Sequence, residues 1–245
     1  MVIVVKSSID GRLQVKSYRS SNPEVRMGFN EDLVILDDGN RGSTYTLVTL
    51  DDCKFHECVD LTEFERDKVI VIHPPDGEFT AMSYRISRET PLGIPFLLTP
   101  NIDINEDTKM VEIHLSLRCE APSSASTVNV VVRVTMPKST TSVSCEPLSS
   151  GQRYEYKPQE KQFTWTIKKM QGGSTCECKA KVMVSEVSRY LKKELGSVCV
   201  DFEIPMYVCS GLQIRFMKVL DHSQMHAPKR WVRYITHSDS YVFRL

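Results

Sequence analysis

The chain has 245 residues, 41% hydrophobic and 25% charged, and its 31 lysines and arginines are balanced by 31 aspartates and glutamates. This length suits one large or two small domains, and the apolar content is enough to form a core. The zero net charge gives no global attraction to nucleic acid, so we expect no nucleic-acid partner and only local basic surfaces. No apolar run approaches the roughly 20 residues that span a bilayer, and the apolar stretch Met1–Val5 is too short for a signal peptide.

The chain contains eight cysteines, at positions 53, 58, 119, 145, 176, 178, 199 and 209. Without a secretory signal, we expect them to be reduced cytosolic thiols. Cys53, His56 and Cys58 include metal-ligand types, but in a strand Cys53 faces away from the other two and no second pair has zinc spacing. Cys176 and Cys178 share one strand face, where cysteine is an ordinary small hydrophobe. We therefore expect no metal and no cofactor.

Short segments in which apolar and polar residues alternate dominate the sequence, and turn residues separate them. Strands are predicted at 12–18, 32–36, 68–73, 78–86, 109–118, 127–136, 141–145, 162–168, 175–184, 198–204, 212–220, 230–235 and 240–244. Only 186–194 has helical spacing, and Gly196 is a suitable residue to end that helix. Many short strands with little helix indicate an all-β sandwich.

Turn residues divide these segments. Residues 37–43 are predicted to be a polar surface loop. Pro74-Pro75-Asp76-Gly77 predicts a tight turn that joins 68–73 and 78–86 into a hairpin. Pro91, Pro95 and Pro100 are predicted to break the chain near a subdomain boundary.

The sequence gives little support to an enzyme. It has no nucleophile elbow, no phosphate-binding glycine loop and no His-Glu-x-x-His helix. His222, His226 and His237 lie in polar segments, where a histidine is more often solvated than catalytic, and a triad is defined by geometry. We predict a chain without enzymatic activity.

The segment Arg230–Ile235 contains a tryptophan and two arginines in an alternating pattern. In a strand, Trp231 and Arg233 share one face. An indole beside a planar cation is suited to bind an aromatic side chain of another molecule. The alternative is a core tryptophan next to a surface arginine, and the six residues alone favour that alternative.

Seven stretches, in order along the chain, resemble the carboxy-terminal signal-binding (mu homology) domain of the medium chains of heterotetrameric clathrin-type adaptor complexes. They are Asp10–Tyr18, Asn22–Glu24, Leu50–His56, Pro74–Phe79, Phe163–Trp165 with Ile167–Lys169, Ser210–Arg215 and Trp231–Ile235. His237–Val242 and Gly172-Gly173 look most like the fourth-complex branch of that family.

The resemblance implies an elongated, immunoglobulin-like β-sandwich of two subdomains, the second inserted into the first. The mu homology domain would cover 1–245, with subdomain A at 1–87 and 208–245 and subdomain B at 88–207. Medium chains also carry an amino-terminal longin-like domain, which this sequence lacks. They further carry a preceding strand whose Phe-x-Asp completes the tyrosine pocket. No stretch of this sequence matches it, so we expect either that the sequence is a fragment or that its tyrosine pocket is incomplete.

The resemblance also implies a function, the recognition of cytosolic tails of transmembrane cargo that carry a tyrosine and, three residues later, a bulky apolar residue. Such a peptide adds to a sheet edge as a strand, and its alternate side chains enter pockets. Trp231, Arg233 and Lys16 match the tyrosine pocket. Ile214, Met217 and Val232 match the apolar pocket, and for Val232 the match rests on resemblance alone. Partners would be two large chains and one small chain of an adaptor complex, peripheral on trans-Golgi network or endosomal membranes and coated vesicles.

The fourth-complex branch is known for a second peptide site on another face. Its phenylalanine matches Phe55 and its arginine falls on Ser83, whereas Arg85 lies two residues further on the same strand face and could substitute. The alternative for Phe55 is plain core packing, which is usual for a large aromatic residue on a strand.

Three basic pairs stand out in this neutral chain: Lys168-Lys169, Lys192-Lys193 and Lys229-Arg230. On a shared face they would attract acidic phospholipid headgroups at about 1 kcal/mol per charge. Scattered solvated lysines are the alternative for each pair. A second hypothesis for the whole chain is therefore a phosphoinositide- or scaffold-binding β-sandwich that binds no peptide signal.

Overall fold

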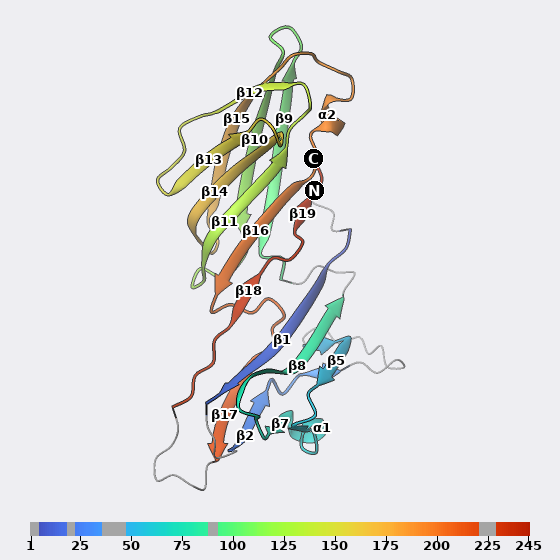
Figure 1. The fold of residues 1–245 in the computed structure, drawn as a ribbon, viewed down its shortest axis with the longest axis vertical. Helices are drawn as coiled ribbons and strands as arrows, with labels where there is room; N and C mark the ends of the chain where they lie inside the picture. The colour runs from blue at the N-terminus through green and yellow to red at the C-terminus, as the bar shows by residue number, and fades with distance from the viewer. Residues whose placement is uncertain (1–4, 19–22, 36–47, 88–92, 221–228) are drawn as a thin grey trace. The chain divides into compact units, whose positions relative to one another are not determined.

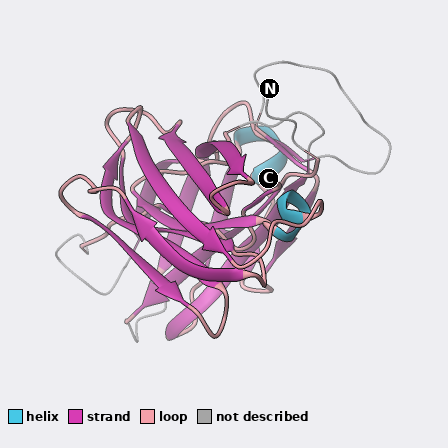
Figure 2. Ribbon diagram, turned by 90° about the horizontal axis from the view of Figure 1, so that it is seen from above, coloured by secondary structure: helices cyan, strands magenta, loops and turns pink. Residues whose placement is uncertain are grey.

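The computed structural model describes residues 5–18, 23–35, 48–87, 93–220 and 229–245, which form two compact units with separate cores (Figure 1). The N-terminal unit draws on Ile3–Leu92 and Val208–Arg233, and the central unit draws on Gly93–Tyr207 and Tyr234–Leu245. Strands make up most of the ordered structure, and each unit has one short helix among its described residues (Figure 2). Neither helix has the length or the apolar character needed to cross a membrane. The all-β prediction is confirmed.

The central unit consists of two antiparallel sheets around one core. The first sheet has the order β13-β14-β11-β16-β18, and β19 also pairs with β16; the second has the order β12-β15-β10-β9. The elements are β9 (Phe96–Asn105), β10 (Met110–Cys119), β11 (Ser126–Thr135), β12 (Thr140–Cys145), β13 (Gln152–Lys157), β14 (Gln162–Gln171), β15 (Thr175–Val184), α2 (Leu191–Glu194), β16 (Val198–Pro205), β18 (Ile235–His237) and β19 (Val242–Phe243).

Buried apolar residues that alternate with exposed polar residues along the strands form the core of the central unit. In β15, Ala180 and Val182 are buried, whereas Lys179 and Lys181 between and beside them are exposed, as the sequence predicts. In β14, Trp165 is fully buried, and its indole Nε1 donates a hydrogen bond to Gln152 Oε1 of β13 at 3.0 Å. Because a buried indole N–H needs a partner, this bond fixes the edge strand β13 against β14.

The described residues of the N-terminal unit form three sheets, with the orders β1-β8-β5, β17-β2-β7-β6 and β3-β4. Its elements are β1 (Ser8–Ser17), β2 (Glu24–Phe29), β3 (Val34–Ile35), β4 (Thr49–Leu50), β5 (Asp52–Phe55), β6 (Val59–Asp60), α1 (Phe64–Asp67), β7 (Val69–Ile72), β8 (Gly77–Ser87) and β17 (Ile214–Leu220). Met27, Phe29, Ile70, Ile72 and Met82, all at most 2% exposed, form the centre of its core.

The hairpin predicted from Pro74-Pro75-Asp76-Gly77 is wrong. β7 pairs with β2 and β6, whereas β8 pairs with β1 and β5, so the turn carries the chain from one sheet to another. The two prolines lack the N–H groups that would continue a ladder. All four residues of β7 are buried, as expected for a strand covered on both faces rather than one half of an exposed hairpin.

Other boundaries differ as well. Pro100 does not break the chain but lies inside β9, opposite Leu115, where an edge strand tolerates a residue without an N–H. The predicted helix 186–194 shortens to α2. The sequence patterns missed β2, β4, β5, β6, β9 and β13, which are short or interrupted by polar residues. The predicted loop 37–43 and Pro91 lie outside the described residues.

The last twelve residues lie elsewhere than expected. The sequence places 208–245 in one subdomain, whereas Tyr234–Leu245 belongs to the central unit. There β18 and β19 both pair with β16, and the Tyr241 hydroxyl donates to the Phe96 carbonyl at 2.6 Å. The chain therefore enters the central unit a second time between Arg233 and Tyr234.

Candidate functional site

The segment Lys229–Tyr234 leads from the N-terminal unit to β18 and lies outside every strand of the described residues (Figure 1). Its exposure alternates: Trp231 and Arg233 are exposed, and Val232 and Tyr234 are half-buried. The predicted alternation is thus present, although the ladder itself begins only at Ile235. Trp231 is 76% exposed, so the alternative of a core tryptophan is wrong.

Lys16 lies near the end of β1, whose ladder partner among the described strands is β8 alone. Its ammonium forms an ion pair with Glu78 of β8 at 2.7 Å, and both side chains are about half exposed. The hydrogen bond and charge of Glu78 raise the pKa of Lys16. Lys16 therefore stays charged, with its positive charge partly balanced by the neighbouring strand.

Ile214 and Met217 are brought together by a bulge in β17. Three residues apart in a regular strand, they would face opposite ways. The register against β2 shifts between Ile214 and Phe216, which places Ile214 opposite Phe29 and Met217 opposite Met27. Both side chains are half-buried and pack on the core of the N-terminal unit. An extra residue in one strand inverts the facing of every later residue in that strand, and alternation alone does not reveal this inversion.

The residues of the expected second peptide site are divided between two faces of the sheet β1-β8-β5. Phe55 pairs with Met82, packs on the core and makes an edge contact with Phe64, at 5.5 Å between ring centroids. Ser83 and Arg85 belong to the opposite face, and Arg85 Nε donates to Asp10 Oδ1 at 2.7 Å. This geometry agrees with core packing for Phe55.

Cysteine and histidine chemistry is limited in this chain. His56 Nδ1 lies 3.1 Å from Cys58 Sγ, and no third metal-ligating group joins them among the described residues. Burial raises the pKa of Cys58 and raises that of Cys53 to about 12. These thiols are protonated and unreactive near neutral pH. His222 and His226 lie outside the described residues.

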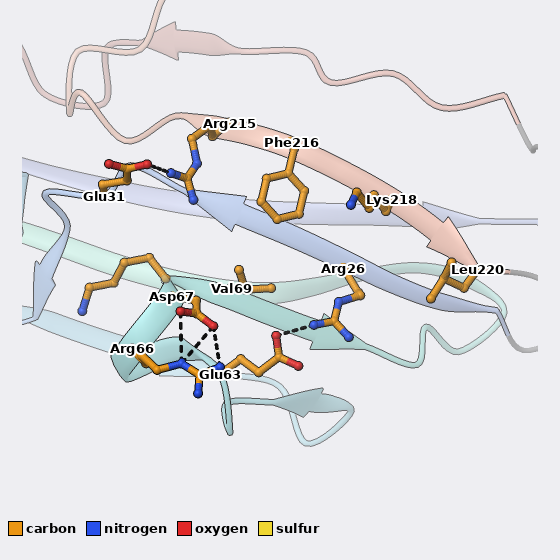
Figure 3. A pocket seen from close by; sticks show the side chains of 11 residues that line it. Arg26, Glu31, Glu63, Arg66, Asp67, Val69, Arg215, Phe216, Lys218 and Leu220 are labelled. Atoms are coloured by element: carbon orange, nitrogen blue, oxygen red, sulfur yellow. Dashed lines mark hydrogen bonds and ion pairs between the residues drawn. The ribbon is translucent and has the colours of Figure 1, made fainter.

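Sequence reasoning missed one feature, a basic hollow over the outer side of β17 and β2 (Figure 3). Its lining includes Phe216, Lys218 and Leu220, which alternate along β17 on the side away from the core. The signal that could have revealed it is this apolar and cationic alternation directly after Arg215. The hollow contains none of the residues matched to the two peptide sites.

The fold is that of a mu homology domain. The yeast delta-COP-I mu-homology domain superposes with a TM-score of 0.73 at 15% identity, covering 97% of this chain and 89% of that one. A homology model of the full-length AP-3 complex in an intermediate open conformation matches with a TM-score of 0.66 at 18% identity, covering 99% of this chain and 63% of that one. Two further matching structures contain a bound peptide. The yeast delta-COP-I domain with a Dsl1 WxWxV peptide has a TM-score of 0.70 at 15% identity, covering 97% of this chain and 89% of that one. The Fcho1 mu homology domain of Danio rerio with an Eps15 peptide has a TM-score of 0.57 at 14% identity, covering 90% of this chain and 78% of that one.

Residues 3–245 match the adaptor complexes medium subunit family, and the chain belongs to this family. Its sequence is 38% identical to the AP-4 complex subunit mu of Arabidopsis thaliana and 31% identical to the human AP-4 complex subunit mu-1, over 99% of this chain and 55% of each relative. The chain thus spans about half the length of the curated relatives it matches. Family membership agrees with the prediction of a non-enzymatic chain.

Proposed function

We propose that this chain is the cargo-binding domain of an adaptor medium chain and recognises tyrosine-based sorting signals in cytosolic tails of membrane proteins. The observation that carries the proposal is that the indole of Trp231 is 76% exposed and that Arg233, two residues further on, is exposed as well. Single exposed aromatic residues are common, and Tyr18 and Tyr190 are also exposed here, so the proposal depends on the pairing of this indole with a neighbouring guanidinium. The indole and guanidinium offer a phenol ring a surface to stack on and a hydrogen-bond donor.

The spacing of the signal fits the segment. In an extended peptide, a tyrosine and a residue three positions later point to opposite sides. Trp231 and Arg233 of Lys229–Tyr234 are exposed, whereas Val232 between them is half-buried. A peptide running alongside as an added strand would place its tyrosine against Trp231 and its apolar residue toward Val232, Ile214 and Met217.

The names of the relatives support a proposal on partners and location. The relatives are named as subunits of AP-4 complexes, and one matching structure is part of an AP-3 complex. We infer that the chain works with two large adaptor chains and one small chain, on the cytoplasmic side of trans-Golgi network or endosomal membranes. The peptide-bound delta-COP-I and Fcho1 structures support peptide binding by this fold.

Calorimetry with a tyrosine-signal peptide tests the proposal. Trp231→Ala should weaken binding by at least about 2 kcal/mol, as for a central interface aromatic residue. Arg233→Lys should also weaken it, because lysine keeps the charge but loses the planar stack. Tyr190→Ala is the matched control, since Tyr190 is 49% exposed and has the Arg189 guanidinium 4.8 Å from its ring centroid.

The outcomes separate the hypotheses. Loss in both site variants, with the control unchanged and a peptide lacking its tyrosine inactive, supports signal recognition. If all three variants bind the peptide with the affinity of the wild-type chain, Trp231 and Arg233 do not form a tyrosine pocket. A chain that binds vesicles but no peptide would instead favour the headgroup- or scaffold-binding alternative.

A further inference from the structure

The hollow seen in Figure 3 lies on the outer side of the N-terminal unit and has a volume of about 760 Å³. We call it the Phe216 hollow. Its lining comprises Arg26, Glu31, Glu63, Arg66, Asp67, Lys68, Val69, Arg215, Phe216, Lys218 and Leu220. The volume is within the range of small-molecule sites, roughly 300–1,000 Å³.

The bulge in β17 creates the floor of the hollow. It directs Phe216, Lys218 and Leu220 outward while Met217 packs on the core. Phe216 lies over Gly28 of β2, where an added Cβ would come within 2.3 Å of the ring. The missing side chain at Gly28 lets the phenyl ring approach the backbone of β2 closely. The Lys218 ammonium is 5.6 Å from the centroid of this ring and the Arg215 guanidinium 5.8 Å.

Positive charge is in excess around the hollow. Its lining holds five cations and three carboxylates. Arg26 pairs with Glu63, Arg66 with Asp67 and Arg215 with Glu31, as the dashed lines in Figure 3 show. In the described part of the chain, Lys68 and Lys218 have no carboxylate partner. Lys68 Nζ donates only to the Glu65 carbonyl, at 3.1 Å.

Two of the cations oppose each other in the ladder. Lys218 of β17 is the direct register partner of Arg26 of β2. Like charges placed directly opposite destabilise a sheet. Glu63 and Glu24 both pair with Arg26 and offset its charge, whereas no carboxylate among the described residues pairs with Lys218, so a bound anion would balance the charge of Lys218. Leu220, 42% exposed, adds an apolar residue at the same hollow.

We propose that the Phe216 hollow binds the phosphate-bearing headgroup of an acidic phospholipid at a membrane surface. Cations from β2, β17 and the end of α1 line one depression and outnumber its carboxylates, which suits an anionic ligand. Ammonium and guanidinium groups are the usual phosphate ligands, and the exposed Leu220 suits the boundary between headgroups and acyl chains. The inference extends the proposed function from cargo to the membrane that carries it, and it shares no residue with the peptide surface.

Vesicle co-sedimentation of the 245-residue chain tests this. The vesicles are phosphatidylcholine with or without a phosphoinositide that carries one phosphomonoester. Lys68→Asn with Lys218→Gln removes the two unbalanced charges, and asparagine tolerates the left-handed backbone of Lys68 (φ 55°). At about fivefold per charge, the double variant should lose affinity roughly thirtyfold.

The matched control is Lys138→Gln with Lys179→Gln, which changes the net charge equally on exposed residues of the central unit. It should leave vesicle binding unchanged. Equal losses in both double variants would overturn the proposal, because attraction would then be general. Binding of soluble inositol phosphate without binding of vesicles would also overturn it, since the source would not be a membrane.

The same variants separate this inference from the proposed function. Lys68→Asn with Lys218→Gln should retain the affinity of the wild-type chain for a tyrosine-signal peptide. If no peptide binds but the thirtyfold vesicle effect is present, the peptide proposal fails while the headgroup site stands.

Discussion

The two tryptophans occupy opposite environments, and this contrast gives the first prediction. Trp165 is fully buried and hydrogen-bonded, whereas Trp231 is 76% exposed. Trp165→Ala should lower the free energy of unfolding by about 3–5 kcal/mol, because it leaves a large cavity in the core of the central unit. Urea denaturation followed by circular dichroism measures this.

Trp231→Ala serves as the comparison and should change stability by less than about 0.5 kcal/mol. A large loss of stability in Trp231→Ala would show that its indole is part of a core. The account of an exposed binding residue would then be contradicted.

Sequence patterns could not distinguish these two tryptophans. Both lie in alternating segments, and alternation says which residues share a face but not which face meets the core. The alternation around Trp231 itself was predictable. The exposure of Trp231 depends on what covers the segment, which is tertiary information.

At the level of elements, the contact between β17 and β2 depends on Gly28. Gly28→Ala should destabilise the N-terminal unit by about 1–3 kcal/mol, because the added methyl group would overlap the Phe216 ring. A double-mutant cycle with Phe216→Ala measures the coupling by urea denaturation.

The expected result is that Phe216→Ala largely rescues Gly28→Ala, since it removes the group that the methyl would strike. Additive effects of the two substitutions would contradict the close packing of this ring on β2.

Long alternating strands such as β10, β11, β14 and β15 were predictable from sequence because a single face of each meets a core. The pairing of β7 and β8 was not, since turn residues report a change of direction and not which sheet the chain joins. The bulge after Ile214 was equally hidden, because one inserted residue reverses the in-and-out pattern of the rest of the strand.

For the whole molecule, burial raises the pKa of several cysteine and tyrosine side chains, Cys178 of the central unit among them, and two of these groups in the N-terminal unit give a test at alkaline pH. Burial raises the pKa of Cys53 from 9.0 to about 12 and also raises the pKa of Tyr84. Well below pH 9.0 the Cys53 thiol is protonated in both the folded and the unfolded chain, so the contribution of the buried thiol to stability is fully present. As pH rises above 9.0, only the unfolded chain ionises the thiol freely, and the free energy of unfolding should fall.

Urea denaturation at a series of pH values, with Cys53→Ala alongside, measures this slope. The variant should lose stability less steeply above pH 9.0 than the wild-type chain. Identical slopes for both chains would contradict the assigned environment of Cys53.

The proposed function depends on the two units and on the segment Lys229–Tyr234, which connects them. The family resemblance was available from seven ordered sequence stretches, and the match over residues 3–245 establishes it. Resemblance could not reveal the Phe216 hollow, because it depends on how β2, β17 and α1 meet in this particular chain.

The central claim is that the exposed side of Lys229–Tyr234 receives a tyrosine-bearing peptide. The chain has only two tryptophans, so its two indole ¹H–¹⁵N signals in an NMR titration report on that claim separately. With a tyrosine-signal peptide, the Trp231 signal should shift saturably and the Trp165 signal should stay in place, and a peptide with alanine for tyrosine should move neither. A saturating peptide that leaves the Trp231 signal unmoved would contradict the account.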